Sequence, residues 1–182
     1  GRPRTIMFTD VEGSTALREE RGDWIADDML AIHELVAREH IDASGGHGTQ
    51  FLGDGFLTIF DSPEKAVACA VAIQHAMDRH NEAHPDRKVR VRIGLHHGEV
   101  TERDGNLYGL AVHAAARVVA QAAGRQILLS ETVRDLIADE FTGEIADLGL
   151  FWLKGFPERW RLYELRWTGE PGNRRPLLGL PA

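Results

Sequence analysis

The chain has 182 residues, a formal net charge of −7 and a sequence pI of about 5.7. This length fits one domain with a sizeable core, and the Lys and Arg residues are too scattered to form a basic stripe, which disfavours nucleic acid as a partner. No apolar run is long enough to span a bilayer, and no signal peptide precedes the first predicted strand, so we expect a cytoplasmic protein without membrane contact. The one cysteine, Cys69, is expected in a buried helix face, and no internal disulfide is expected.

The amino-terminal part predicts a strand followed by a helix. Residues 4–8 form a short β run. The helix is expected over residues 24–40, where apolar side chains recur at helical spacing: Ile25, Met29, Ile32 and Val36.

Residues 49–60 predict two strands folded about the Gly-Asp-Gly sequence at 53–55, although an Asp-Gly pair is equally typical of a simple hairpin turn. A helix is expected to follow and to end near Asn81. Ser62 or Asp61 can cap its first turn.

The remaining sequence alternates strands with helices. Apolar residues at every second position predict a strand over 89–95 with one face buried. The later elements are a helix at 109–122 closed by Gly124, a strand at 126–129, a helix at 130–140 capped by Ser130, and strands at 144–153 and 159–167.

This order of elements favours an α+β sandwich, with helices on one face of a largely antiparallel sheet. From Thr168 onward the composition shifts to Gly, Pro and Arg, which is typical of a linker. We therefore expect one folded domain over residues 1–168 and a linker or tail towards a further domain over residues 169–182.

Asp10 and Asp54 each stand where an apolar run gives way to glycine. Taken singly, Asp10 could cap a helix and Asp54 could fill a turn. If the first strand lies beside the hairpin, the two carboxylates reach the same end of the sheet, and their repulsion favours a cation between them. Hard oxygen ligands suit Mg²⁺ or Mn²⁺, and Mg²⁺ commonly joins carboxylates to substrate phosphates.

Gly13, Ser14 and Thr15 follow the first of these acids directly. At a helix start, their backbone N–H groups could bind anionic oxygens. Metal together with phosphate is the chemistry that these residues indicate.

Four segments resemble, in this order and at fitting spacings, the catalytic domain of the class III nucleotidyl cyclases, the adenylyl and guanylyl cyclases of bacterial type. They are FTDVEGST at 8–15, FLGDGF at 51–56, VRIGLHHGEV at 91–100 and GNLYGLAVHAAARV at 105–118. The resemblance covers about residues 5–167. It implies a ferredoxin-like palm, a homodimer with composite active sites, and conversion of ATP, and more weakly GTP, to the cyclic 3′,5′-monophosphate and pyrophosphate with two divalent cations.

The family's two metal-binding aspartates match Asp10 and Asp54, and a metal-binding backbone carbonyl matches Val11. The family's transition-state residues, an Asn and an Arg one helical turn later, match His113 and Arg117. Arginine offers a fixed fork of donors to the α-phosphate, and a neutral imidazole can still donate one hydrogen bond to the ribose, as Asn would. The competing interpretations are a solvated surface arginine and a histidine packed on its helix.

Lys154 matches a lysine that contacts the triphosphate, although an exposed loop lysine is the competing interpretation. The residues that read the purine match Gln50 and Asn106, where adenylyl cyclases have Lys and Asp. Because a primary amide offers a donor and an acceptor, this pair can address adenine or, when turned over, guanine; a strand-surface Gln and a turn Asn are the alternatives.

The resemblance implies a division of the site between two protomers. One supplies Asp10, Gln50 and Asp54, and the other supplies the remaining residues, namely Asn106, His113 and Arg117.

His96 and His97 are adjacent, so they point to opposite faces of a strand and cannot share a zinc ion. The alternative to an enzyme is a degenerate, non-catalytic nucleotide-binding or dimerisation module that regulates an attached domain. The departures at His113, Gln50 and Asn106 favour that alternative, whereas the two aspartates and Arg117 favour the enzyme.

Overall fold

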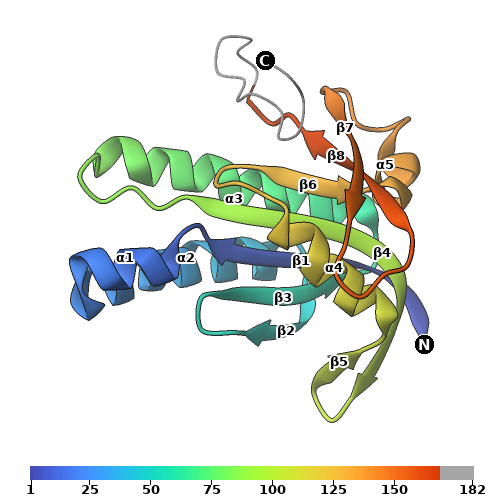
Figure 1. Ribbon diagram of the computed structural model, residues 1–182, viewed down its shortest axis with the longest axis horizontal. Helices are drawn as coiled ribbons and strands as arrows, with labels where there is room; N and C mark the ends of the chain where they lie inside the picture. The colour runs from blue at the N-terminus through green and yellow to red at the C-terminus, as the bar shows by residue number, and fades with distance from the viewer. Residues whose placement is uncertain (169–182) are drawn as a thin grey trace.

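The computed structural model describes residues 1–168 (Figure 1). Its elements in chain order are β1 Arg2–Val11, α1 Ser14–Arg21, α2 Asp23–Ala43, β2 His47–Phe51, β3 Gly55–Phe60, α3 Pro63–Ala83, β4 Val91–Arg103, β5 Asn106–Tyr108, α4 Leu110–Ala120, β6 Ile127–Ser130, α5 Glu131–Ile137, β7 Ile145–Trp152 and β8 Arg159–Leu165. The expected linker lies outside the described residues and stays a prediction.

The strands form one sheet in the order β2-β3-β1-β4-β6-β8-β7, with β5 paired to the end of β4. Every pairing is antiparallel except that of β4 with β6. The two central strands, β1 and β4, therefore have partners on both sides. This arrangement confirms the predicted α+β class and its largely antiparallel sheet.

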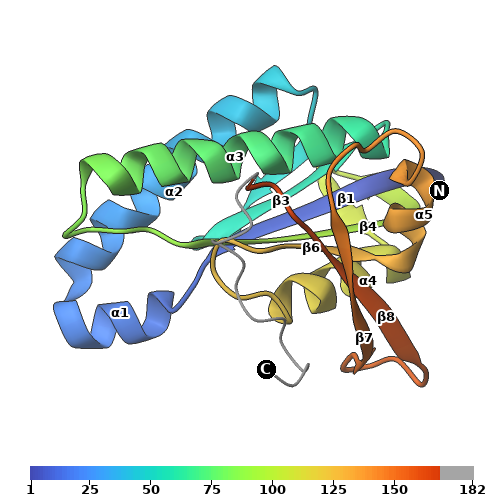
Figure 2. The ribbon, with the colours of Figure 1, turned by 90° about the horizontal axis from the view of Figure 1, so that it is seen from above.

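Helices cover both faces of the sheet, so the expectation of helices on one face is wrong (Figure 2). Helices α2, α3 and α5 pack over one face, whereas α4 packs over the other, chiefly on β4. Gly94 permits this approach, because a side-chain carbon there would lie 2.6 Å from the backbone nitrogen of Val119. As a result, β4 is buried on both faces along its first half rather than on one.

Residues next to the helix ends predicted most of these ends from the sequence. The Ser62 hydroxyl accepts a hydrogen bond from the Lys65 N–H, and Ser130 caps α5, as predicted. Helix α4, however, ends at Ala120, and Gly124 stands beyond its cap. The expected Gly124 cap is therefore wrong.

The core contains the single cysteine in the predicted position. Cys69 is fully buried on α3, and burial raises the pKa of its thiol to about 12. The thiol is therefore protonated and unreactive at neutral pH. Within residues 1–168, no helix combines the length and the apolar character needed to cross a membrane.

Two buried histidines predict that the fold loses stability in acid. Burial lowers the pKa of His33 and of His96 to about 4, below the ordinary value of about 6.5. The unfolded chain binds these protons first, so stability is complete above about pH 6.5 and falls progressively as the pH drops towards 4. Each histidine contributes a loss of about 3 kcal/mol.

Urea unfolding between pH 7.5 and pH 4.5 checks this prediction. The free energy of unfolding should fall more steeply with pH in the parent chain than in a His33→Gln variant. Replacement of the exposed His75 by Gln is the matched control and should leave the slope unchanged. An identical slope in the parent and in His33→Gln would contradict the assignment.

Candidate active site

Asp10 and Asp54 lie at the same end of the sheet, as the sequence predicted. Asp10 is near the end of β1, where it pairs with Gly55 at the start of β3, and Asp54 stands in the preceding turn. The Val11 N–H donates a hydrogen bond of 3.3 Å to the Asp54 carbonyl, which joins the two segments directly. The juxtaposition follows from antiparallel pairing of β1 with the β2–β3 hairpin.

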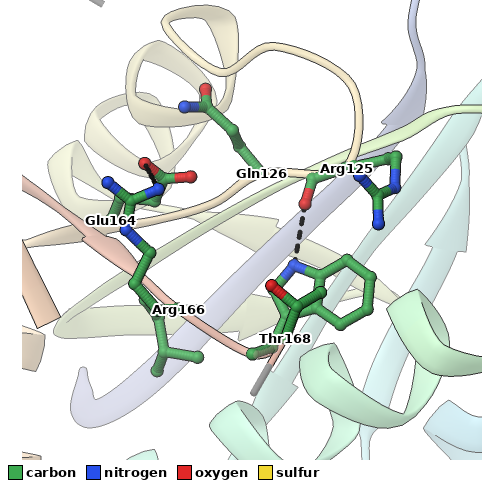
Figure 3. Close-up of a pocket in the computed structure, with 7 residues that line it drawn as sticks. Arg125, Gln126, Glu164, Arg166 and Thr168 are labelled. Atoms are coloured by element: carbon green, nitrogen blue, oxygen red, sulfur yellow. Dashed lines mark hydrogen bonds and ion pairs between the residues drawn. The ribbon is translucent and has the colours of Figure 1, made fainter. Parts of the chain in front are cut away.

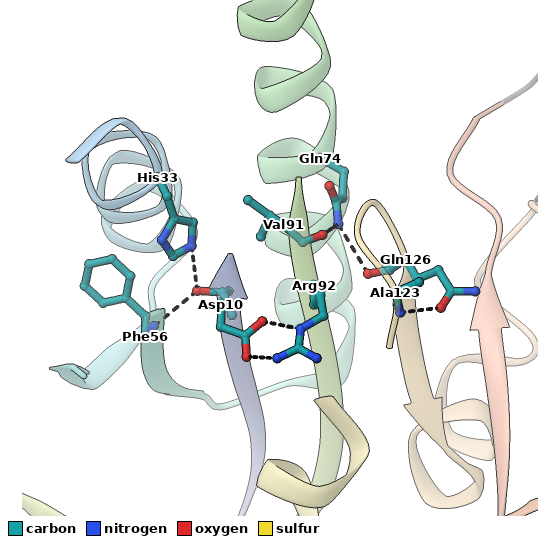
Figure 4. A network of polar contacts seen from close by, with 9 residues as sticks. Asp10, His33, Phe56, Gln74, Val91, Arg92, Ala123 and Gln126 are labelled. Carbon is teal, nitrogen blue, oxygen red and sulfur yellow. Dashed lines mark hydrogen bonds and ion pairs between the residues drawn. The ribbon is translucent and has the colours of Figure 1, made fainter. Parts of the chain in front are cut away.

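Asp10 is held by a cation that the sequence interpretation missed. Arg92, its register partner on β4, donates hydrogen bonds of 2.6 Å from Nε and from Nη2 to the two carboxylate oxygens (Figure 4). The side chains of Asp10 and Arg92 are 19% and 27% exposed, so the pair is partly shielded from water. Arg92 is the one cationic residue of the VRIG segment, and its pairing with Asp10 depends on the register of β1 and β4, which the sequence does not show.

The electrostatics of this end favour a bound cation. Burial raises the pKa of Asp10, and the nearby carboxylates of Asp54 and Glu12 raise it further, while Arg92 opposes them. A divalent ion would relieve this repulsion, and its preferred ligands are carboxylate and carbonyl oxygens of the kind gathered here. Residues 1–168 contain no cluster of three or more His, Cys, Asp or Glu residues suited to a metal ion, so water and substrate oxygens would have to complete the coordination.

The segment after Asp10 opens a helix as expected. Gly13 adopts a left-handed conformation, with φ of 69°, and caps α1, which begins at Ser14. The first turn of α1 carries no acidic residue, and no side chain caps it. Its free N–H groups and the positive end of the helix dipole thus remain available for an anion.

His113 and Arg117 both lie on α4, one turn apart. His113 is exposed and Arg117 is half-buried, and within the described part of the chain neither side chain has a hydrogen-bond or ion-pair partner. Lys154, in the turn between β7 and β8, is likewise exposed and unpaired among residues 1–168. No hydrogen bond or ion pair among residues 1–168 therefore joins these three residues to Asp10 or Asp54.

Gln50 and Asn106 meet within one chain. The Gln50 Nε2 atom donates hydrogen bonds to the Asn106 Oδ1 atom at 3.0 Å and to the Gly105 carbonyl at 3.1 Å. The expected division, which assigned Gln50 and Asn106 to different protomers of one site, does not fit this contact, because the two side chains touch within one chain. Strand β5, which carries Asn106 and was not predicted, produces this contact by folding back along β4.

His96 and His97 point to opposite faces of β4, as predicted. His96 Nδ1 lies 2.7 Å from the Ser130 hydroxyl, and His97 Nδ1 lies 2.9 Å from the Thr5 hydroxyl. They cannot bind one ion together.

A separate small cavity lies where β8 ends (Figure 3). Its volume is about 30 Å³, which is the room needed by a single water molecule. Its lining includes Arg125, Gln126 and Trp167, and the Trp167 Nε1 atom donates to the Arg125 carbonyl at 2.8 Å. None of the predicted site residues lines this cavity.

The sheet thus carries two carboxylates at one end, beside the start of a helix that no side chain caps. A sequence model described as the adenylate and guanylate cyclase catalytic domain matches residues 3–166. The chain belongs to this family, and the recognition made from the four segments is confirmed.

One solved structure that is named as a cyclase agrees with this assignment, and two further relatives are similar in sequence. The crystal structure of an adenylate/guanylate cyclase/hydrolase from Silicibacter pomeroyi superposes with a TM-score of 0.79 at 30% identity, covering 90% of this chain and 96% of that one. An "uncharacterized protein" of Mycobacterium tuberculosis is 33% identical over 74% of this chain, and the serine/threonine-protein kinase pkn2 of Myxococcus xanthus is 27% identical over 91% of it. The chain spans only 34% and 20% of the lengths of these two relatives.

Proposed function

We propose that this domain converts ATP to cyclic 3′,5′-AMP and pyrophosphate in a homodimer, with two divalent cations, Mg²⁺ or Mn²⁺. The observation that carries the proposal is the placement of Asp10 and Asp54 at one end of the sheet, beside the uncapped start of α1. When bound, the cations would lower the pKa of the ribose 3′-hydroxyl and neutralise the triphosphate.

The chain's own residues divide the binding work. Asp10, Asp54 and the Val11 carbonyl hold the cations, and the N–H groups of Gly13, Ser14 and Thr15 bind phosphate oxygens.

Arg92 holds the Asp10 carboxylate in the absence of a cation, so cation binding must weaken the 2.6 Å pair. Its planar fork is equally suited to a phosphate group that arrives with the cation.

The residues of α4 and the β7–β8 turn act on the reacting end of the substrate. Arg117 donates to the α-phosphate oxygens as charge builds there, His113 donates to the ribose ring oxygen, and Lys154 binds the outer phosphates. The 3′-hydroxyl gives up its proton to water, its oxygen forms a new bond to the α-phosphorus in line with the bond that breaks, and pyrophosphate leaves with the electron pair of that bond.

The unpaired state of these three side chains supports a site completed by a second copy of the chain. Large apolar side chains stand exposed close to the proposed site residues in sequence: Leu52, Tyr108, Leu110 and Trp152. Apolar surface of this kind is typical of an interface. A homodimer brings Arg117 and His113 of one protomer towards Asp10 and Asp54 of its partner.

The assay that tests the function is direct. The purified chain is incubated with ATP and Mn²⁺, and cyclic AMP is measured. Formation of cyclic AMP supports the enzyme, whereas nucleotide binding without turnover supports the non-catalytic module that His113, Gln50 and Asn106 favour as the second candidate.

The amide pair predicts weak discrimination between purines. With both Gln50 hydrogens directed at Gly105 and Asn106, the pair as it stands leaves a Gln50 acceptor and an Asn106 donor, which suit guanine. Adenine requires the Gln50 amide to turn over, at the cost of the hydrogen bond to the Gly105 carbonyl. ATP and GTP should therefore compete more evenly than at a site with fixed donors.

A Gln50→Lys, Asn106→Asp double change should raise the selectivity for ATP over GTP by about tenfold or more. It replaces two reversible amides by a fixed donor and a fixed acceptor, and a mismatched base edge then leaves buried groups unpaired, at roughly 1 to 3 kcal/mol each. The measurement is kcat/KM for both nucleotides on both proteins. An unchanged ratio with persisting activity would show that these residues do not read the purine.

A further inference from the structure

His33 is a polar residue with no exposed surface, on the side of α2 that packs against the sheet. Its Nε2 atom lies 3.0 Å from the hydroxyl oxygen of Thr9, and its Nδ1 atom has no partner among the described residues. An unsatisfied ring nitrogen in an apolar core costs stability, which an apolar residue of similar size would avoid. A buried histidine at this position is therefore expected to have a role that depends on its single hydrogen bond to Thr9.

The Thr9 hydroxyl connects three elements directly behind the two carboxylates. It accepts a hydrogen bond of 3.2 Å from the Phe56 N–H, so the same oxygen contacts His33 on α2 and the backbone of β3. Thr9 immediately precedes Asp10, and Phe56 stands two residues after Asp54. The Thr9 hydroxyl therefore adds a side-chain link between the strand that carries Asp10 and the start of β3, beside the backbone hydrogen bond from Val11 to Asp54.

Further packing makes this junction stiff. A side-chain carbon at Gly55 would overlap the Thr9 carbonyl oxygen, so the two backbones approach as closely as glycine allows. The His33 ring also packs against Phe56, with 6.0 Å between ring centroids. Burial lowers the pKa of His33 to about 4, so at neutral pH the ring is uncharged and its contact with Thr9 is constant.

We propose that His33 is a positioning residue that acts through the Thr9 hydroxyl to fix the separation of Asp10 and Asp54, and thereby sets the affinity of this end of the sheet for a divalent cation. The proposal rests on the proposed function, because it takes these two carboxylates as the cation ligands. Residues that orient ligands in this way typically change metal affinity by about 10- to 100-fold when they are replaced.

The test measures Mn²⁺ binding directly. The purified chain is titrated with Mn²⁺ in the presence of 3′-deoxy-ATP, which cannot cyclise, and free Mn²⁺ is followed by electron paramagnetic resonance. Thr9→Val keeps the shape of the side chain, and His33→Phe keeps an aromatic ring, although a larger one; both remove the hydrogen bond. Each should weaken Mn²⁺ binding by about tenfold.

Three comparisons separate positioning from a general loss of stability. The double variant should be no weaker than the single variants, since the two residues act as one unit. Thr9→Ser retains the hydroxyl and should bind Mn²⁺ within about twofold of the parent. The matched control is Thr5→Val, which removes a similar contact, of 2.9 Å between Thr5 and His97, farther from this end of β1. It should leave Mn²⁺ binding unchanged.

The proposal is overturned if Thr9→Val binds Mn²⁺ like the parent, or if Thr9→Ser is as weak as Thr9→Val. Asp10→Ala distinguishes failure of the proposed function from failure of this inference. If Asp10→Ala retains parental Mn²⁺ binding, the cation ligands themselves are wrong. If it loses binding while Thr9→Val does not, only the positioning role of His33 is wrong.

Discussion

Replacing Asp10 or Asp54 by alanine is expected to abolish cyclic nucleotide formation while the chain remains folded. Asp54 is exposed in a turn and Asp10 is paired only at the sheet end, so neither side chain fills the core. Removing either carboxylate leaves the cations without a ligand and the triphosphate without its counter-charge. Turnover of ATP with Mn²⁺, measured beside a thermal unfolding curve, checks the prediction.

A matched control is available on the opposite side of the sheet. Asp78 forms a two-point pair with Arg125, at 3.0 and 2.9 Å, much as Asp10 does with Arg92. Asp78→Ala should therefore cost some stability and leave turnover close to that of the parent. If Asp10→Ala or Asp54→Ala keeps more than about a tenth of the activity, that residue does not hold a cation on which the reaction depends.

The helices and strands whose ends are set by residues close in sequence could be predicted from the sequence. Alternation and helical spacing identified the strands except β5 and most of the helices, and Ser62 and Ser130 marked two helix starts correctly. The placement of α4 could not be predicted in this way. It depends on Gly94 meeting Val119 across the sheet, which is a contact between distant parts of the chain.

In the candidate site, too, some residues could be predicted from local sequence signals and others could not. Asp10 and Asp54 stand at visible breaks between apolar runs and glycine, so the sequence identifies them. Arg92 and His33 give no comparable signal, because one is an alternating residue within a strand and the other lies on a helix among apolar residues. Their roles arise from strand register and from packing, as does the contact between Gln50 and Asn106.

The contact between Gln50 and Asn106 changes which residues each protomer is expected to contribute to the proposed site. Gln50 and Asn106 are in contact within one chain, so in the proposed dimer the residues left to be divided between protomers are the carboxylates and the α4 pair. Within one chain, Asp10 is paired with Arg92, and Arg117 has no partner among the described residues. This arrangement supports a cleft in which the carboxylates of one protomer face Arg117 of its partner.

A mixture of two inactive variants, Asp54→Ala and Arg117→Ala, is expected to regain activity. In a heterodimer of these chains, one cleft takes Asp54 from one protomer and Arg117 from the other and is whole, while the second cleft lacks both residues. Random exchange makes half of the dimers mixed, so the mixture should reach roughly a quarter of the parental activity.

Mixing Asp54→Ala with Asp10→Ala is the control and should stay inactive, because both residues serve the same side of a cleft and each cleft then lacks one of them. Chain exchange is verified by capturing a tagged variant and detecting its untagged partner. If the first mixture remains inactive although the chains have exchanged, the carboxylates and Arg117 do not meet across a dimer interface, and the composite site is wrong.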